Sequence, residues 1–416
     1  MCELFIFFYF IVRIPWLVQT SFMSNRSFAP ITAAIHSQRP TLLSRPISSP
    51  IFQTTTFAIP SSADLSRMAV EVSTPGFYTR HGNPNHAELG DAVAALEGTE
   101  RGLVFGSGMA ALTTTVLALV QSGDHVVAQK SMYGVALKLV QSLLPRLGVD
   151  FTLVDQTDVS AWERAVTPST RLFLIESPSN PRLEVTDIAA VAEIARDRGI
   201  VTLADNTFAS PVNQRPINLG IDLVWHSATK YLAGHSDASA GVVVGPATLI
   251  DTIWNMSLTV GAVLGPFDAW LVMRGIRTLH LRVARHNATG ATIAEHLSER
   301  ADVAVVYYPG LVAHPSHTVA ARQMADFGGV VSFELRGGFD AAARMIERLE
   351  LFQLSASIGS VESLAVHPAS MWGTALSDDQ IAAAGLQPGL VRLSCGLEDP
   401  ADLIYDLDRA LNALAQ

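Results

Sequence analysis

Short apolar runs alternate along the chain with stretches of helical periodicity. The apolar runs are typical of buried strands and cover residues 125–128, 151–154, 171–175, 200–204 and 222–225. A helical pattern from Ile188 to Arg198, closed by Gly199, lies between two of these runs. Strands and helices in this alternation predict an α/β fold with a mostly parallel central sheet that helices cover on both faces.

The pattern changes after residue 264. A long helical stretch begins at Gly265, continues to Leu279 and is expected to bridge two domains. Strands at 303–307, 330–335 and 390–394, with helices at 341–349 and 401–414, then predict a smaller C-terminal α+β domain. We therefore expect the site-bearing domain at residues 76–264, and the interdomain helix and C-terminal domain at residues 265–416.

Residues 23–75 differ from both domains. They are rich in Pro, Ser and Thr and show little helical periodicity, which predicts an extended N-terminal arm of the kind that often wraps a partner subunit. The first helix is expected to begin at Asn85, a good N-cap with Glu88 three residues later, and to end at Gly98.

Residues 1–22 form an apolar leader. Arg13 and Pro15 interrupt it, so it falls short of a transmembrane helix of about 20 apolar residues, and it lacks the basic start of a signal peptide. We interpret the leader as an upstream mis-start or a cloning scar, with Met23 as a more natural beginning. A membrane anchor is the alternative.

Composition and charge narrow the classes of function. The 416 residues, 49% hydrophobic and 16% charged, suffice for one large domain with a sizeable core and a smaller one. The formal charge of −10 and the pI near 5.6 argue against a general nucleic-acid or anionic-membrane binder, because both need a basic face. The two cysteines, Cys2 and Cys395, build no disulfide framework and have no metal-ligand neighbours. We expect a reducing, cytoplasmic compartment and no metal.

Polar side chains follow several of the predicted strands. They are Tyr133, Glu176, Asn180, Asp205, Ser227, Thr229 and Lys230. Because ligands of open α/β sheets bind outside the carboxyl ends of parallel strands, we expect these side chains to converge on one crevice. Singly, each is better explained as a cap, a turn former or, for Lys230, a surface lysine; jointly they favour a site.

Two further segments carry groups that could bind an anion such as a phosphate. The turn Gly106-Ser-Gly108 leads from a short apolar strand into a helix, so the backbone N–H groups of Gly108 and Met109 could hold a phosphate. The segment is neither a dinucleotide fingerprint nor a P-loop, which lowers the expectation of NAD or ATP. Upstream, Tyr78 and Arg80 lie two residues apart in an extended segment and could clasp a phosphate from outside.

These groups together specify one cofactor. Lys230 could bond covalently to an aldehyde, Asp205 could pair with a ring nitrogen, and Tyr133 could stack on an aromatic ring. With hydroxyls and helix-start amides for a phosphate, the set predicts pyridoxal 5'-phosphate (PLP). The acid would keep the ring nitrogen protonated, which makes the ring an electron sink for a carbanion.

The chain also resembles a known family. The motifs are Tyr-x-Arg-x-Gly-Asn-Pro, Gly-Met-Ala-Ala, Glu-Ser-Pro-x-Asn-Pro, Asp-Asn-Thr-Phe-Ala-Ser-Pro, His-Ser-Ala-Thr-Lys-Tyr, Arg-Gly-Ile-Arg-Thr-Leu, Val-Glu-Ser-Leu-x-x-His-Pro and Val-Arg-Leu-Ser-x-Gly-Leu-Glu-Asp. In order, from about residue 35 to the end, they are similar to those of the cysteine and methionine metabolism family of PLP enzymes. The resemblance implies the fold type I PLP-transferase architecture.

The resemblance implies roles by position. Lys230 would bind the cofactor and move protons, Asp205 would face the ring nitrogen, and Tyr133 would stack on the ring and serve as a candidate acid. The phosphate would be held by Gly108, Met109, Ser227 and Thr229, and from a neighbouring subunit by Tyr78 and Arg80. Asn180 would lie near the ring hydroxyl.

Substrate binding is implied in the same way. Arg392 would clamp the α-carboxylate of a small amino acid with its bidentate fork, and Ser357 would contribute nearby. Without the surrounding motif, Arg392 would be better explained as an arginine at a strand edge that forms a surface ion pair. Because the site is then shared between chains, the resemblance implies a homodimer at least and usually a tetramer.

Three positions bear on the reaction. Ala356 stands where cystathionine lyases and γ-synthases generally carry a glutamate, and Val135 stands where methionine γ-lyases commonly carry a reactive cysteine. Trp372 departs from the residues that often follow His-Pro-Ala-Ser-Met and could narrow the substrate channel, or pack at its rim. These departures suggest an apolar-walled γ pocket.

We therefore expect a lyase that catalyses γ-elimination from methionine- or homocysteine-like amino acids. The alternative is γ-replacement on an O-acylhomoserine by a thiol, and a related γ-substituted amino acid is a further option. A non-catalytic subunit would be suspected if Lys230, Asp205 or Arg392 were altered, and none is. A nicotinamide dehydrogenase lacks its glycine fingerprint.

Overall fold

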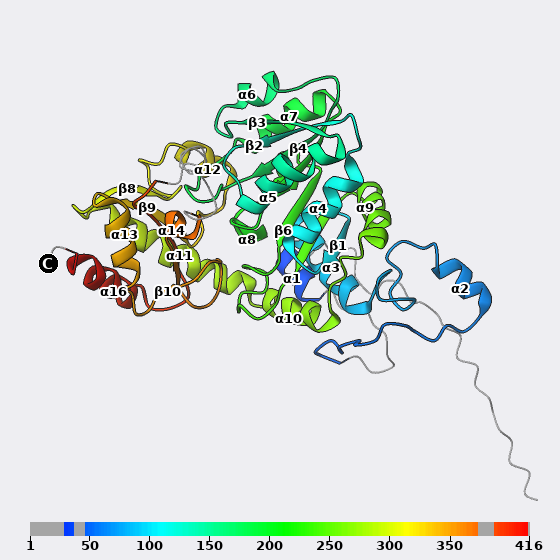
Figure 1. Ribbon diagram of the computed structural model, residues 1–416. Helices are drawn as coiled ribbons and strands as arrows, with labels where there is room; N and C mark the ends of the chain where they lie inside the picture. The colour runs from blue at the N-terminus through cyan, green and yellow to red at the C-terminus, as the bar shows by residue number, and fades with distance from the viewer. Residues whose placement is uncertain (1–28, 37–45, 373–386, 415–416) are drawn as a thin grey trace, which may run out of the picture.

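A twisted central sheet organises the larger part of the molecule (Figure 1). The computed structural model describes residues 29–36, 46–372 and 387–414. The strands of this sheet are β1 (Arg101–Phe105), β2 (His125–Gln129), β3 (Asp150–Val154), β4 (Thr170–Glu176), β5 (Val201–Asp205), β6 (Leu223–Ser227) and β7 (Gly241–Gly245). Their order across the sheet is β1-β7-β6-β5-β4-β2-β3.

The sheet is mostly parallel, as predicted. Strands β3, β2, β4, β5 and β6 pair in parallel, whereas β7 runs antiparallel to both of its neighbours, β6 and β1. Strand β7, with the sequence Gly-Val-Val-Val-Gly, was not among the predicted strands. All five of its residues are buried, so it is a core strand inserted between β1 and β6.

Helices cover both faces of the central sheet (Figure 1). They are α3 (Pro84–Glu97), α4 (Gly108–Leu119), α5 (Gly134–Lys138), α6 (Val159–Arg164), α7 (Ile188–Asp197), α8 (Ser210–Asn213) and α9 (Ala247–Val260), with the short helices η1 (Leu139–Leu143), η2 (Pro145–Leu147) and η3 (Pro216–Leu219). Side chains of α3, α6 and α7 belong to one apolar core, and those of α4, α5 and α9 belong to the other.

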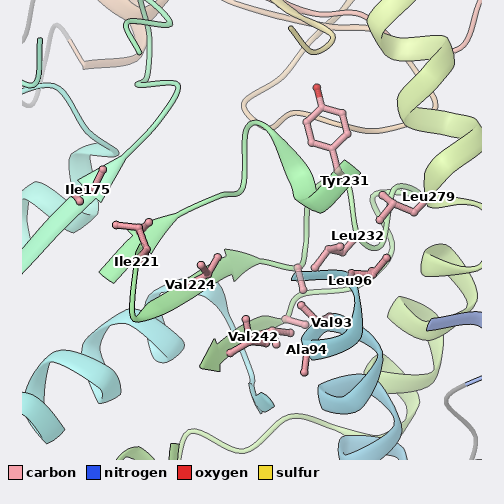
Figure 2. Close-up of a cluster of buried hydrophobic side chains, with 14 of the residues drawn as sticks. Val93, Ala94, Leu96, Ile175, Ile221, Val224, Tyr231, Leu232, Val242 and Leu279 are labelled. Atoms are coloured by element: carbon pink, nitrogen blue, oxygen red, sulfur yellow. The ribbon is translucent and has the colours of Figure 1, made fainter. Parts of the chain in front are cut away.

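The strands divide their side chains between these two cores. On β4, Phe173 and Ile175 pack in the core with α3 and α7, while Leu172 and Leu174 pack in the core with α4 and α9. This is the period-two alternation of a strand buried on both faces. Figure 2 shows the first core, where Val93 from α3 lies beside Val242 from β7.

A second sheet forms the C-terminal part. Its strands are β8 (Val303–Tyr307), β9 (Val330–Leu335), β10 (Gln353–Leu354), β11 (Leu364–Val366) and β12 (Leu390–Ser394), in the order β10-β11-β12-β9-β8. Its helices are α12 (His317–Gln323), α13 (Gly338–Ile346), α14 (Pro368–Trp372) and α16 (Pro400–Asn412). The three longer strands match the predicted ranges, which confirms the smaller α+β unit.

The predicted helix from Gly265 to Leu279 is two helices. They are α10 (Pro266–Ile276) and α11 (Leu279–Ser298), separated at Arg277 and Thr278. Helix α10 packs against α3 of the large unit, and α11 packs against β8 and β9 of the small one. Residues on both sides of the break, Ile276 and Leu279, pack in the same core, and only the later part of α11, from Ile293, packs in the core of the small unit.

The N-terminal arm is less uniform than predicted. It contains two short helices, α1 (Pro30–Ile35) and α2 (Ser62–Met68), so the first helix does not lie at residue 85. Helix α1 packs on α3 with Ala34 fully buried. The N-cap of α3 is Asn83, whose side chain accepts a hydrogen bond from Asn85 N at 3.0 Å; Asn85 is already inside the helix. The predicted end at Gly98 is confirmed, because that residue adopts the left-handed conformation that caps α3.

Within the described part of the chain, no helix combines the length and apolarity needed to cross a bilayer. The leader at residues 1–22 lies outside the described residues.

Candidate active site

The carboxyl ends of three neighbouring strands bring the candidate groups together. Glu176 ends β4, Asp205 ends β5 and Ser227 ends β6. Glu176 and Asp205 are directly paired across the ladder, and Asp205 is paired with Trp225 on the other side. Lys230 follows three residues after Ser227, in the turn beyond β6. These candidate groups therefore meet at one edge of the sheet.

Lys230 faces the second sheet. Its Nζ donates a hydrogen bond to Oγ of Ser357 at 2.8 Å. Burial, and secondarily the positive charge of Arg392, lowers the pKa of Lys230. Within the described residues no ion pair joins this lysine to a carboxylate. The amine is therefore shifted toward its neutral form, which is the form that acts as a nucleophile or as a base.

Ser357 connects Lys230 with Arg392. Its φ is +130°, a value that L-residues rarely adopt, and its carbonyl oxygen accepts a hydrogen bond from Nη2 of Arg392 at 3.1 Å. Backbone strain of this kind persists only where the surroundings hold it in place. The residue thus contributes its hydroxyl to one functional group and its carbonyl to another.

Arg392 comes from the middle of β12 and is 8% exposed. Its Nη1 donates to Oδ1 of Asn180 at 2.9 Å, while its Nε is buried and has no hydrogen-bond partner among the described residues. Burial lowers its pKa to about 10, which leaves the guanidinium charged at neutral pH. A buried cation with an unused donor suits a carboxylate ligand. Asn180, expected near the ring hydroxyl, is engaged with this arginine.

Asp205 is a partly buried carboxyl to which no basic side chain is bonded in the described structure. Its Oδ1 accepts the backbone N–H of Thr207 at 2.9 Å. Burial raises its pKa to about 6, against the hydrogen bonds from Thr207 and the charge of His226. A nearby cation would reverse this shift, so the position fits a protonated ring nitrogen.

Glu176 was predicted among the polar groups at this sheet edge, but no role was assigned to it. It is 2% exposed and lies beside Asp205. Burial, and secondarily the charge of Asp205, raises its pKa to about 8. The signal in the sequence was the Glu-Ser-Pro-x-Asn-Pro motif, in which a role was assigned only to Asn180.

The start of α4 lies against the end of β6. Ser107 caps α4 by accepting from Ala110 N at 3.0 Å, which leaves the amides of Gly108 and Met109 at the open helix end. A Cβ at Gly108 would lie 2.8 Å from Cβ of Ser227, so only glycine lets the two segments approach this closely. Amides and a hydroxyl thus form a cradle of the kind that binds phosphate.

Thr229 is bound within its own turn. Its hydroxyl donates to Ala240 O at 3.2 Å and accepts from Ala240 N at 3.1 Å. To bind a phosphate as predicted, the hydroxyl would have to donate its hydrogen to the phosphate instead of to Ala240 O.

Tyr133 and Val135 lie at the beginning of α5. Their exposed fractions are 43% and 37%, and the backbone N–H of Tyr133 is held by Glu176. Ala356 is also exposed and immediately precedes Ser357. Trp372 is the last residue of α14, but its side chain and residues 373–386 lie outside the described residues.

Tyr78 and Arg80 are not joined to Lys230 by any contact of this chain. Nη1 of Arg80 donates to Leu258 O of α9 at 2.9 Å, and its guanidinium lies 5.5 Å from the centre of the Tyr78 ring. Their role at the cofactor of a neighbouring subunit stays a prediction.

The residues fit PLP. Asp205 lacks a cation, the cradle at Gly108 and Ser227 would be filled by a Cβ, and the amine of Lys230 is not tied to a carboxylate. The sequence model for "Cys/Met metabolism PLP-dependent enzyme" matches residues 31–412. The chain belongs to this family of PLP-dependent enzymes. The predicted cofactor, fold class and family are thereby confirmed.

Individual relatives cover most of the chain. The L-methionine gamma-lyase of Pseudomonas putida is 44% identical over 368 residues, which is 88% of this chain and 92% of the relative. The O-succinylhomoserine sulfhydrylase of Pseudomonas aeruginosa is 40% identical, covering 88% of this chain and 90% of its own. A crystal structure of cystathionine gamma synthase from Xanthomonas oryzae pv. oryzae, in complex with aminoacrylate and cysteine, superposes with a TM-score of 0.88 at 39% identity, covering 93% of this chain and 98% of that one. The chain is thus an enzyme of sulfur amino acid metabolism, a lyase or a γ-replacement transferase.

Proposed function

We propose that the protein is a γ-lyase that converts methionine- or homocysteine-like amino acids to an α-keto acid, ammonia and the sulfur leaving group, which is a thiol from methionine and hydrogen sulfide from homocysteine. The observation that carries this choice is the uncharged rim of the site. Val135 and Ala356 are both exposed beside the groups that bind the substrate, and neither can hold a distal amino group. An apolar γ substituent is then the better match. The similarity to methionine gamma-lyases supports the same choice.

In this proposal Arg392 binds the substrate α-carboxylate. Its unpartnered Nε and one Nη can donate in parallel to two carboxylate oxygens, while Asn180 and Ser357 keep the guanidinium plane fixed. Since the arginine is buried, the ion pair forms away from bulk water and orients the Cα–H bond.

Lys230 is then the base at the α carbon. Its lowered pKa provides a neutral amine that accepts the Cα proton and can return it further along the substrate. PLP, when bound, supplies the electron sink that makes this proton acidic. Asp205 holds the proton on the ring nitrogen, and the phenol of Tyr133 is the candidate acid that protonates the leaving thiolate.

The second candidate is γ-replacement. The sulfhydrylase relative, and the cystathionine gamma-synthase of Mycobacterium bovis at 42% identity over 385 residues, favour it. The exposed side of Tyr133 and Val135 leaves room for a thiol to approach.

One assay separates the two. The purified holoenzyme is incubated with methionine, homocysteine, cystathionine or O-succinylhomoserine, with and without a thiol. We expect 2-oxobutyrate from methionine or homocysteine without added nucleophile. A thioether as the sole product, and only in the presence of thiol, would establish replacement instead.

The assembly is part of the proposal. We propose that two chains share each site, with Tyr78 and Arg80 of one chain reaching the phosphate of the other, in a dimer that pairs into a tetramer. The mass of the particle by light scattering, and the loss of PLP affinity in Arg80→Ala, test this arrangement. A cytoplasmic location is proposed with it, as expected for an enzyme with two cysteines and no disulfide framework.

A further inference from the structure

One buried carboxyl group contacts both sides of the proposed site. Oε2 of Glu176 accepts the backbone N–H of Tyr133 at 2.7 Å, and Oε1 accepts the backbone N–H of Asn180 at 2.9 Å. Tyr133 follows β2 and Asn180 follows β4, so the two loops come from different strands. The carboxyl group therefore fixes these loops relative to each other.

Asn180 passes this constraint to the second sheet. Its Oδ1 accepts from Nη1 of Arg392 at 2.9 Å, and Arg392 lies on β12. A continuous chain of hydrogen bonds thus runs from the segment that carries the candidate acid to the guanidinium that binds the substrate. Glu176 is its central member.

Glu176 itself has little freedom. Gln129 Oε1 accepts its N–H at 2.8 Å, and Gln129 Nε2 donates to its carbonyl at 2.9 Å. The charges that face its carboxyl are Asp205 on β5 and Arg392 on β12. Each of its two oxygens accepts one backbone N–H, whereas an amide would turn an NH2 group toward one of the two N–H donors.

We propose that Glu176 is a positioning residue that aligns the Tyr133 loop with the substrate-binding guanidinium of Arg392. It is not a catalytic residue, because it touches no reacting atom. The inference rests on the proposed roles of Tyr133 and Arg392 and adds a residue whose function is to hold the two at a fixed separation. Its first consequence is on substrate affinity, since Arg392 loses the orientation that Asn180 gives it.

The test measures binding without turnover. L-Norleucine carries the α-amino and α-carboxylate groups but no γ leaving group, so its affinity can be read from the absorbance of the PLP holoenzyme. We expect Glu176→Gln to keep its PLP and its unfolding temperature near those of the wild type, and to raise the norleucine Kd by about tenfold, as loss of a hydrogen bond to a charged group predicts. Glu176→Asp retains a carboxyl group with two acceptor oxygens and should recover part of the affinity.

Glu184→Gln is the matched control. This carboxyl lies in the segment after the same strand, accepts from Gln156 and pairs with Arg182 at 2.7 Å; among the described residues its side chain makes no hydrogen bond or ion pair with a proposed site residue. Its Kd should stay within about twofold of the wild type. If Glu176→Gln binds norleucine like the wild type, or fails to fold, the positioning role is wrong. If the wild type binds norleucine but forms no 2-oxobutyrate from methionine or homocysteine, the γ-lyase proposal is contradicted and the positioning role of Glu176 is not.

Discussion

Replacing Gly108 by alanine tests the phosphate cradle with one methyl group. The added Cβ would lie 2.8 Å from Cβ and 2.9 Å from Cα of Ser227. Since carbon atoms prefer separations of about 3.5–4.0 Å, the start of α4 and the end of β6 must separate by roughly 0.7–1.2 Å. Cα of Ser227 belongs to a core strand, so a side-chain rotation cannot relieve the overlap.

The size of the effect follows from this overlap. Inserting a methyl group into a packed contact costs about 1–3 kcal/mol. If this free energy is lost from phosphate binding between α4 and β6, the affinity for PLP drops by about 5- to 150-fold. Alanine is the better helix former by up to about 1 kcal/mol, so helix propensity alone predicts the opposite sign.

The assay is a titration of the apoenzyme with PLP, followed by absorbance, together with the unfolding temperature of the apo form. Gly265→Ala is the matched control, because Gly265 also precedes a helix and its added Cβ would meet only a rotatable carboxylate, Asp268 Oδ2, at 3.3 Å. Its PLP affinity should match the wild type. A Gly108→Ala enzyme with unchanged PLP affinity would refute the cradle between α4 and β6.

Three further outcomes are expected. Lys230→Ala should lose the visible absorbance of the bound cofactor and at least about 10²–10⁴-fold of the turnover rate, since both the attachment point and the base are gone; a yellow, active variant would contradict this. Arg392→Lys keeps the charge but not the fork, so KM for the amino acid should rise roughly 10- to 150-fold, measured against an unchanged PLP affinity. In the apo form, the raised pKa of Asp205 contributes stability below pH 3.8 that is lost as pH rises through about 6. Between pH 3.8 and about 6, the free energy of unfolding of Asp205→Asn, measured with denaturant, should therefore rise relative to that of the wild type. If the two unfolding free energies change with pH in parallel, the effect is excluded.

The sequence predicts the sheet and the place of the site well, for physical reasons. Strands buried on both faces are continuous apolar runs, and topology alone brings their carboxyl ends to one edge. Lys230, Asp205 and Asn180 could therefore be chosen from their position after such runs. Arg392 needed the resemblance, because nothing local distinguishes a functional arginine from one in a surface ion pair.

Contacts between distant segments could not be predicted in this way. The role proposed for Glu176 depends on an N–H 43 residues earlier in the chain, that of Tyr133. Helix α11 joins two cores, with Leu279 in one and Ile293 in the other, and that division depends on segments distant in the chain. Helix α1 escaped prediction because its six residues are too few to show a period, and it is held by burial of Ala34 against α3.

The charged groups of the site lack what its ligands supply. Among the described residues, no cation is bonded to Asp205, a partly buried acid, and no carboxylate pairs with Lys230, a partly buried amine. Arg392 is a buried cation whose Nε has no described partner. Each costs free energy in the apo protein, because burial disfavours charge and an unpaired donor loses its water. A ring nitrogen and a substrate carboxylate remove the costs at Asp205 and Arg392 when they bind. The folded state is therefore coupled to its ligands by mass action, and stability given up at this edge of the sheet returns as affinity.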